Sequence, residues 1–406
     1  MSRLILTLNA GSSSVKFAAF ALDGGGLEEL ARGQVEGLGA QATFSARRAS
    51  GAKTEYAFDQ SRRAADHRGA MAAILRWLGD ERLDRDVAAV GHRVVHGGPD
   101  ISAPARIDAA LLKTLRGFIP LAPLHQPYNI LGVEAALEAF PRTPQIACFD
   151  TAFHRTHPFV ADAFGLPRAY YEEGVRRYGF HGLSYQYIAR RLRAIAPAAA
   201  AGRAIVAHLG NGASMCAMRD GRSVASTMSF TPLDGLPMGT RPGQLDPGVL
   251  LYLMTAKGMS ASAIDDLLQH QSGLKGLSGL SQDMRVLEAS DSPAARDAIA
   301  YFVARIRYEI GGLAAAIEGV DAIVFTAGIG ENAWRVREAV LTGMEWLGVR
   351  LDKAANQANA QRISAADSAT AAFVLKTNEE RMIAEHAAET AGLVDSQAEA
   401  SFAAAR

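Results

Sequence analysis

The sequence has little of what marks secreted, membrane-spanning or nucleic-acid-binding proteins. Only 2 of its 406 residues are cysteine. Cys148 and Cys216 form neither a disulfide framework nor a zinc-ligand spacing, which favours core thiols in a reducing, cytoplasmic compartment. Its 42 basic residues balance its 42 acidic ones, so no overall charge attracts nucleic acid or an anionic membrane. The amino-terminal apolar stretch is too short for a secretory leader, and no apolar run approaches the roughly 18 residues of a membrane span.

An α/β architecture is predicted from the alternation of two patterns. Short β-branched runs that end in glycine or asparagine alternate with longer stretches of helical period. The length and the 49% hydrophobic content suffice for a sizeable core in two or three domains. The clearest helix is expected at residues 293–317, where Ser292 would cap the helix and Pro293 would lie in its first turn, and another is expected at residues 68–78. The expected strands are residues 4–8, 87–90, 145–149, 204–208 and 322–326.

The two halves of the chain contain a weak internal repeat. Residues 4–14 and 204–214 each show a strand, an asparagine among small residues, and then a second apolar run. Each unit is therefore predicted to be a β-hairpin with a small-residue turn. A duplicated hairpin that cradles phosphate is the simplest interpretation.

Three glycine-containing loops follow predicted strands. Residues 9–14, followed by Lys16, combine unobstructed backbone N–H groups, hydroxyls and a positive charge, which suits a polyanion. The spacing is not that of a Walker loop, and alone such a turn is more often only a hairpin. Residues 208–212 form a second loop, and residues 325–332 form a third between a strand and a helix. The three together favour a nucleotide site.

Polar residues beside glycine and proline supply the other groups that phosphoryl transfer needs. The reaction requires cationic donors around the phosphoryl oxygens, a carboxylate near the acceptor and oxygen ligands for Mg²⁺. Arg93, Arg241, His181, Asp150 and Glu379 are candidates for these roles. Spacing alone does not assign them, and each could be an ordinary loop residue.

Two longer segments resemble the signatures of a known family. Residues 6–17 read LTLNAGSSSVKF, and residues 228–241 read MSFTPLDGLPMGTR. Both are similar to signatures of the acetate kinase (acetokinase) family, and the resemblance extends from Leu4 to about Ala384. It implies an actin/hexokinase/Hsp70-like fold of two α/β domains, each with a mixed five-stranded sheet, and a nucleotide cleft between them. The expected domains are residues 1–150 with about 383–406, and residues 151–382.

The resemblance also implies an activity and roles for particular residues. The activity is reversible, direct in-line transfer of the γ-phosphoryl group of ATP to acetate, giving acetyl phosphate and ADP. Arg93 and Arg241 would hold acetate and the phosphoryl group, His181 would steady the developing charge, and Asp150 would orient the acceptor or the metal. Mg²⁺, with Mn²⁺ as the alternative ion, would be held by Asn9 and Glu379. Besides Arg93, the expected acyl pocket consists of Val95, Leu124, Phe180 and Pro232. The expected nucleotide-binding residues are Ser12, Ser14, Lys16, His208, Leu209, Gly210, Asn211, Gly212, Asp283, Met284, Arg285, Gly328, Ile329, Gly330, Glu331 and Asn332.

Other interpretations remain open from the sequence. A propionate or butyrate kinase of the same family is the nearest alternative. A regulatory nucleotide switch or chaperone on the same fold, or a purely structural protein, is a more distant one. Pro242, Gln244, Ala327 and Lys376 depart from the usual family residues, although none of them has an assigned chemical role. A homodimer is expected from the family.

Overall fold

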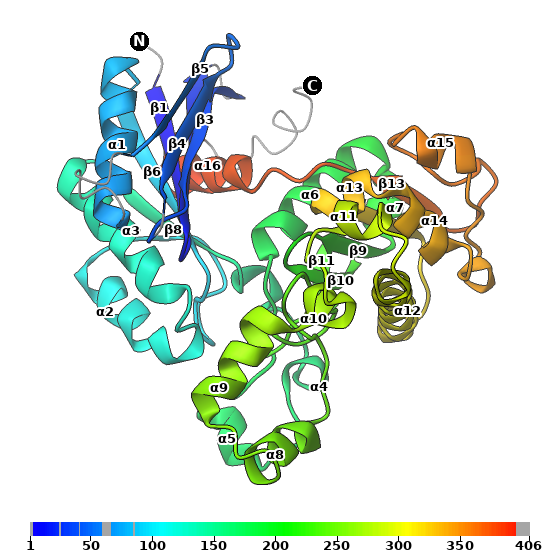
Figure 1. The fold of residues 1–406 in the computed structure, drawn as a ribbon. Coiled ribbons are helices and arrows are strands. Elements are labelled where there is room, and N and C mark those ends of the chain that lie inside the picture. Colours follow the sequence, from blue (N-terminus) through cyan, green and yellow to red (C-terminus); the bar gives the residue numbers. More distant parts are fainter. Residues whose placement is uncertain (1–2, 24–25, 40, 59–65, 84–85, 395–406) are drawn as a thin grey trace. The chain divides into compact units, whose positions relative to one another are not determined.

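The structure is a computed structural model that describes residues 3–23, 26–39, 41–58, 66–83 and 86–394 (Figure 1). The chain divides into two compact units. Unit 1 consists of Met1–Arg155 and Asn378–Arg406, and unit 2 consists of Thr156–Thr377. Residues 395–406 of the predicted return segment 383–406 lie outside the described residues. No helix in the described part of the chain is both long and apolar enough to cross a membrane.

Unit 1 is built on a mixed sheet of eight strands in the order β5-β4-β3-β2-β1-β6-β8-β7. β1, β6 and β8 are parallel neighbours, and the other neighbouring strands pair antiparallel. The prediction of five strands is wrong for this unit, because an antiparallel meander continues beyond the first hairpin. Its last strand is largely exposed and lacks the apolar alternation that would have revealed it. The strands are β1 Arg3–Ala10, β2 Ser14–Asp23, β3 Gly26–Glu36, β4 Thr43–Arg48, β5 Lys53–Ala57, β6 Val87–Val94, β7 Ala105–Arg106 and β8 Gln145–Phe149.

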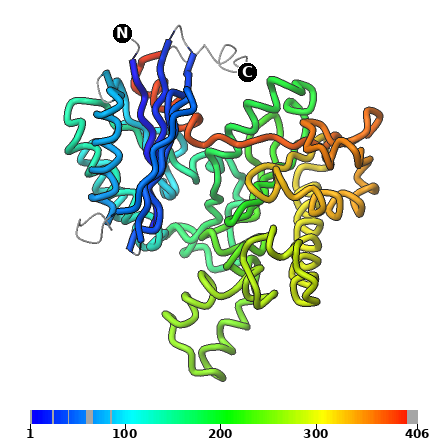
Figure 2. Tube along the Cα trace, turned by 45° about the horizontal axis from the view of Figure 1, so that its top comes forward, coloured from blue at the N-terminus to red at the C-terminus, as the bar shows by residue number. Residues whose placement is uncertain are grey.

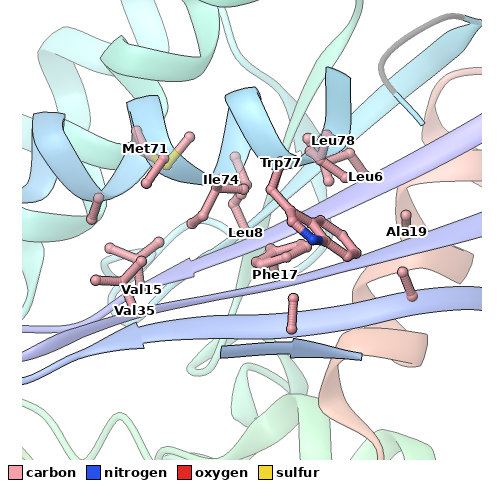
Figure 3. Close-up of a cluster of buried hydrophobic side chains, with 14 of the residues drawn as sticks. Leu6, Leu8, Val15, Phe17, Ala19, Val35, Met71, Ile74, Trp77 and Leu78 are labelled. Carbon is pink, nitrogen blue, oxygen red and sulfur yellow. The ribbon is translucent and has the colours of Figure 1, made fainter. Parts of the chain in front are cut away.

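Helices cover both faces of this sheet. α1 (His67–Asp80) and α3 (Gln126–Ala139) pack on one face. Figure 3 shows Met71, Ile74, Trp77 and Leu78 of α1 against Leu6, Leu8, Val15 and Phe17 of the strands. α16 (Glu379–Thr390) packs on the opposite face, where an added methyl group at Gly91 would lie 2.6 Å from Ile383. The remaining helical segments of unit 1 are α2 Ala109–Gly117, η1 Ile119–Leu121 and η2 Ala152–His154.

Unit 2 contains a mixed sheet of five strands in the order β11-β10-β9-β12-β13, as predicted. β9, β12 and β13 are parallel, and β9, β10 and β11 are joined antiparallel. The β9–β10 hairpin of unit 2 corresponds to the β1–β2 hairpin of unit 1, so both predicted hairpins are confirmed. The strands are β9 Arg203–Leu209, β10 Ala213–Arg219, β11 Arg222–Ser226, β12 Ala322–Thr326 and β13 Ala371–Val374.

The longest helix of unit 2 is α12 (Pro293–Ala316), the long yellow coil in Figures 1 and 2. Its predicted bounds were one residue too long at the end. Ser292 occupies the N-cap position but its side chain makes no capping hydrogen bond, so the predicted side-chain cap is wrong. The other helical segments are α4 Phe159–Asp162, α5 Arg168–Glu172, α6 Gly182–Ile195, α7 Pro197–Ala201, α8 Pro247–Thr255, α9 Ala261–Asp266, η3 Leu267–Gln271, α10 Gly273–Ser278, α11 Met284–Glu288, α13 Ala327–Asn332, α14 Trp334–Leu341, η4 Glu345–Leu347 and α15 Lys353–Gln357.

Candidate active site

Three predicted site residues of unit 1 meet where parallel strands end. Asn9 lies near the end of β1, Arg93 near the end of β6, and Asp150 directly after β8. Because the carboxyl ends of parallel strands share one edge of a sheet, the three side chains converge. Arg93 donates to both oxygens of Asp150, from Nε over 3.1 Å and from Nη2 over 2.5 Å. Its Nη1 donates to Asn9 Oδ1 over 3.2 Å.

A second carboxylate joins this cluster from the first residue of α16. Glu379 Oε2 lies 3.9 Å from Arg93 Nε. The pKa of Glu379 is raised to about 7, chiefly because burial removes its carboxylate from water; Asp150 and Glu380 also raise this pKa, whereas Arg93 and Lys16 lower it. Burial lowers the pKa of Arg93, but Asp150 and Glu379 outweigh that effect and raise it overall. One guanidinium therefore faces two carboxylates, which leaves an excess of negative charge.

This excess negative charge fits a divalent cation. In the described part of the chain, no group of three or more His, Cys, Asp or Glu residues is arranged to hold a metal. Mg²⁺ does not need such a cage, because it usually binds one or two carboxylates and completes its shell with water and substrate phosphates. Asp150, Glu379 and Asn9 carry side-chain oxygens that could serve as ligands of this kind.

The first predicted phosphate loop joins β1 to β2. It is closed by a hydrogen bond from Gly11 N to Ser14 O of 2.8 Å, and Ser12 is exposed beside it. Lys16 points to the same face of the sheet as Asn9, with which it pairs in register. Lys16 lines a pocket of about 480 Å³ in unit 1, and the other charged residues of this lining are Arg32, Arg47, Lys53, Glu55 and Glu380.

Two buried residues that the sequence did not single out hold the first loop in place. Asn129 of α3 donates from Nδ2 to the carbonyl of Ala10 over 2.6 Å and accepts from the backbone N–H of Val95 over 2.9 Å. His67 donates from Nε2 to the carbonyl of Gly11 over 2.6 Å. Asn129 thus ties the start of the phosphate loop to the residues that follow β6. Neither residue lies within a helix that was predicted from the sequence, so no sequence signal singled them out.

A histidine and serine network lies in unit 2 beside the second hairpin. His181 adopts a left-handed backbone conformation (φ 57°) at the N-cap of α6, and its ring is stacked on His208 at 4.2 Å between centroids. His181 Nδ1 lies 2.8 Å from Ser214 Oγ, which is 2.5 Å from the hydroxyl of Tyr185. His208 Nδ1 lies 2.8 Å from Ser184 Oγ. The stack and these hydrogen bonds fix the orientation of both imidazole rings.

Arg241 lies beside the same hairpin. Its Nη1 donates to the carbonyl of Pro232 over 2.8 Å. A methyl group added at Gly212 would lie 3.2 Å from Arg241 Nη2 and 3.4 Å from His181 Nε2, so both side chains converge on this glycine. Burial lowers the pKa of Arg241, and no carboxylate of the described residues lies within 4 Å of it. A partly desolvated cation of this kind favours an anionic ligand.

A pocket of about 660 Å³ in unit 2 brings together most of the nucleotide-binding residues that were predicted for this unit. Glu331 and Gly330 do not line it. Glu331 Oε1 instead accepts from the backbone N–H groups of Ala327 (2.9 Å) and Thr377 (3.2 Å), and the carbonyl of Gly330 accepts from Arg337 (2.9 Å). His208, Leu209 and Gly212 also lie outside the lining. The predicted lining residues are Gly210, Asn211, Asp283, Met284, Arg285, Gly328, Ile329 and Asn332, and the unpredicted ones are Gln282, Glu288 and Ala333.

The residues expected in the acyl pocket come from both units. Val95 and Leu124 belong to unit 1, whereas Phe180 and Pro232 belong to unit 2. Val95 and Phe180 are buried, and Leu124 and Pro232 are half-buried. Their roles stay predictions.

Comparison with known proteins identifies the family of this chain. The model of the acetokinase family matches residues 4–385. An acetate kinase of Methylocella silvestris is 59% identical over 98% of this chain and 100% of that protein. The chain belongs to the acetokinase family. Another acetate kinase, from Rhizobium meliloti, is 54% identical over 94% of this chain and 97% of that protein.

Solved structures of acetokinase family members have the same fold. The Porphyromonas gingivalis acetate kinase superposes with a TM-score of 0.87 at 37% identity, over 96% of this chain and all of that one. A propionate kinase from Francisella tularensis gives a TM-score of 0.89 at 34% identity, over 95% and 98% of the two chains. The predicted actin/hexokinase-like ATPase fold is thereby confirmed, apart from the strand count of unit 1. The acetokinase family uses ATP.

Proposed function

We propose that this protein is an acetate kinase that forms acetyl phosphate and ADP from acetate and ATP, reversibly. The observation that carries this proposal is Arg93, which Asp150 and Asn9 hold at the shared edge of β1, β6 and β8. A guanidinium fixed in this way is suited to bind a carboxylate or a phosphoryl group by paired hydrogen bonds. The identity to acetate kinases named above supports the same activity.

The reaction needs no strong base. Acetate is already ionised at neutral pH, so an oxygen of acetate attacks the γ-phosphorus directly while the bond to the bridging oxygen of ADP breaks. Arg93 and Arg241 would bind the acetate carboxylate and the equatorial oxygens of the transferring group. His181 would stabilise the charge that develops there. Catalysis then depends on positioning and electrostatic stabilisation.

Asp150, Glu379 and Asn9 would hold Mg²⁺. When bound, the ion would supply positive charge that offsets the charge of the phosphate oxygens. Asp150 also keeps Arg93 oriented through its two hydrogen bonds. Mn²⁺ prefers similar oxygen ligands and could replace Mg²⁺.

ATP would lie along the pocket of unit 2. The small residues of the Gly210–Asn211 loop let the backbone approach phosphate, and α13 and α11 would flank the nucleoside. The first loop of unit 1, with Ser12, Ser14 and Lys16, would supply further phosphate contacts.

Propionate kinase activity is the second candidate, and similarity to the Francisella tularensis propionate kinase favours it. Val95, Leu124, Phe180 and Pro232 would form a small apolar acyl pocket. One methylene in such a pocket changes specificity by only about 1–3 kcal/mol. We therefore expect propionate to be a poorer substrate than acetate and butyrate to be poorer still.

We also propose that the protein is a cytoplasmic homodimer. Both cysteines are free and buried, which suits a reducing compartment. α8 contains no buried residue, although Val249, Leu251, Tyr252 and Met254 are 39%, 63%, 52% and 48% exposed. A helix so apolar and so exposed favours burial against a second copy of the chain.

The activity is tested by acyl-hydroxamate formation with MgATP and acetate, propionate or butyrate. Arg241→Ala should lower kcat by about 10³- to 10⁵-fold, as expected for a cation that stabilises a phosphoryl-transfer transition state. Arg222→Ala, at an exposed arginine of β11, is the matched control and should retain native activity. A native protein that hydrolyses ATP but phosphorylates none of the three acids would contradict the proposal.

A further inference from the structure

One carboxylate oxygen in the pocket of unit 2 has no hydrogen-bond partner among the described residues. Glu288, the last residue of α11, lines this pocket, and its Oε1 is buried without a hydrogen bond. The positive charge that acts on its carboxylate is that of Arg335, which makes no hydrogen bond to Oε1. The other acid of the lining differs, because Asp283 is paired with Arg285 at 2.6 Å and accepts from the Arg285 backbone N–H.

An unpaired buried acceptor of this kind calls for an explanation. Leaving a buried oxygen without a donor is unfavourable, so most such groups in folded proteins are paired or serve a ligand. Burial also raises the pKa of Glu288, which Arg335 only partly offsets. The torsion that orients a glutamate carboxylate is broad, so a rotation that brings this oxygen toward the pocket costs little. A donor that entered the pocket could therefore satisfy this side chain without a change in the backbone.

The position of Glu288 in the pocket indicates which part of a nucleotide it would meet. The phosphate-cradling loop lies beside the start of α13, because a methyl group added at Gly210 would be 3.6 Å from the Cβ of Ala327. Ala333 follows the end of α13, about 9 Å further along the helix axis. Arg335 comes after this end of α13 in the chain, and its positive charge acts on the carboxylate of Glu288. With the phosphates at Gly210, the base would lie toward Glu288.

We propose that Glu288 accepts a hydrogen bond from the exocyclic amino group of adenine and so makes the enzyme prefer adenine over 6-oxopurine nucleotides. The inference rests on the proposed function, because it requires ATP in this pocket. Adenine presents an N–H donor at its C6 position, whereas hypoxanthine and guanine present a carbonyl acceptor there. A carboxylate attracts the amino group of adenine and repels the carbonyl oxygen of a 6-oxopurine. A charged hydrogen bond of this type should change kcat/KM by about 10- to 100-fold.

The test compares ATP with ITP in the native protein, in Glu288→Gln and in a matched control. An amide can accept from an amino group or donate to a carbonyl, so Glu288→Gln should bring the ATP-to-ITP ratio of kcat/KM close to one. Glu345→Gln makes the same chemical change at an exposed site outside the pocket and should keep the native ratio. An unchanged ratio in Glu288→Gln would overturn the proposal.

Two further measurements separate the possible failures. If Glu288 instead holds a ribose hydroxyl, Glu288→Gln will reduce discrimination against 2′-deoxy-ATP or 3′-deoxy-ATP while the ATP-to-ITP ratio stays native, and the proposal is then wrong. Calorimetric binding of MgADP and MgIDP measures base preference without turnover. A protein that prefers ADP through Glu288 but phosphorylates no acid would refute the proposed activity and support this inference.

Discussion

Replacing Asn129 by leucine removes a buried link between the first predicted phosphate loop, at the β1–β2 turn, and the chain that follows β6. The side chain is 2% exposed, and its amide pairs with both the Ala10 carbonyl and the Val95 N–H. Leucine has a similar size but offers neither a donor nor an acceptor. The substitution therefore tests whether Asn129 holds the loop through these two hydrogen bonds or whether its side chain only fills space.

The expected effect follows from the two backbone groups that lose their partners. A buried polar group left unpaired costs about 1–3 kcal/mol, so Asn129→Leu should lower the free energy of unfolding of unit 1 by about 2–6 kcal/mol. With the slopes usual for urea, the unfolding midpoint should fall by roughly 1–2 M. The phosphate loop and Val95 would also lose their fixed separation, so kcat should fall in protein that remains folded.

Tryptophan fluorescence during urea unfolding can follow the two units separately. Trp77 is 6% exposed and packs on Phe17 at 5.6 Å between ring centroids, so it reports unit 1. Trp334 and Trp346 belong to unit 2, and their transition is the internal reference. A midpoint for Asn129→Leu within about 0.3 M of native would refute the reasoning.

A second variant at this position makes the test sharper. Asn129→Asp keeps an acceptor for Val95 but, when ionised, places an oxygen against the carbonyl of Ala10. A protonated aspartic acid could donate to that carbonyl instead. The deficit in stability relative to native should therefore shrink as the pH falls. If the deficit were the same at pH 8 and pH 5, the hydrogen bond to Ala10 would not matter.

Two further predictions concern pH and assembly. Burial lowers the pKa of His92 to about 4, whereas an unfolded histidine keeps its ordinary pKa of about 6.5. Between these two pH values the unfolded state therefore binds more protons than the folded state. As a result, His92 should lower the free energy of unfolding by about 2 kcal/mol between pH 7 and pH 5. Urea unfolding of His92→Asn at pH 7 and pH 5 should lack this part of the pH dependence. If the free energy of unfolding changed with pH as much as in the native protein, the prediction would be contradicted. Leu251→Glu on α8 should convert the proposed dimer to a monomer in sedimentation equilibrium, whereas Arg350→Glu at another exposed site should not. A monomeric native protein would rule out the dimer.

The regular elements with strong apolar patterns were predictable from the sequence. Residues 204–208 and 322–326 form strands, both glycine-containing hairpins are present, and α12 lies within one residue of its expected bounds. β5 could not be foreseen, because its mostly exposed side chains carry no apolar period. The Ser292 side chain makes no capping bond, because a capping residue type does not by itself fix the local geometry. The domain boundaries and the roles of the site residues stay predictions.

Sequence by itself determined the α/β class, the glycine loops that permit close approach of phosphate, and the resemblance to the acetokinase family. Each of these depends on residue types within a short window, where local sterics and hydrogen bonding act. Only the tertiary structure decided that Arg93 meets Asp150, 57 residues away, that Asn129 links two strand ends, and that Glu288 lies unpaired in a pocket. Such contacts depend on how strands and helices from distant parts of the chain pack together, and no local pattern encodes that arrangement.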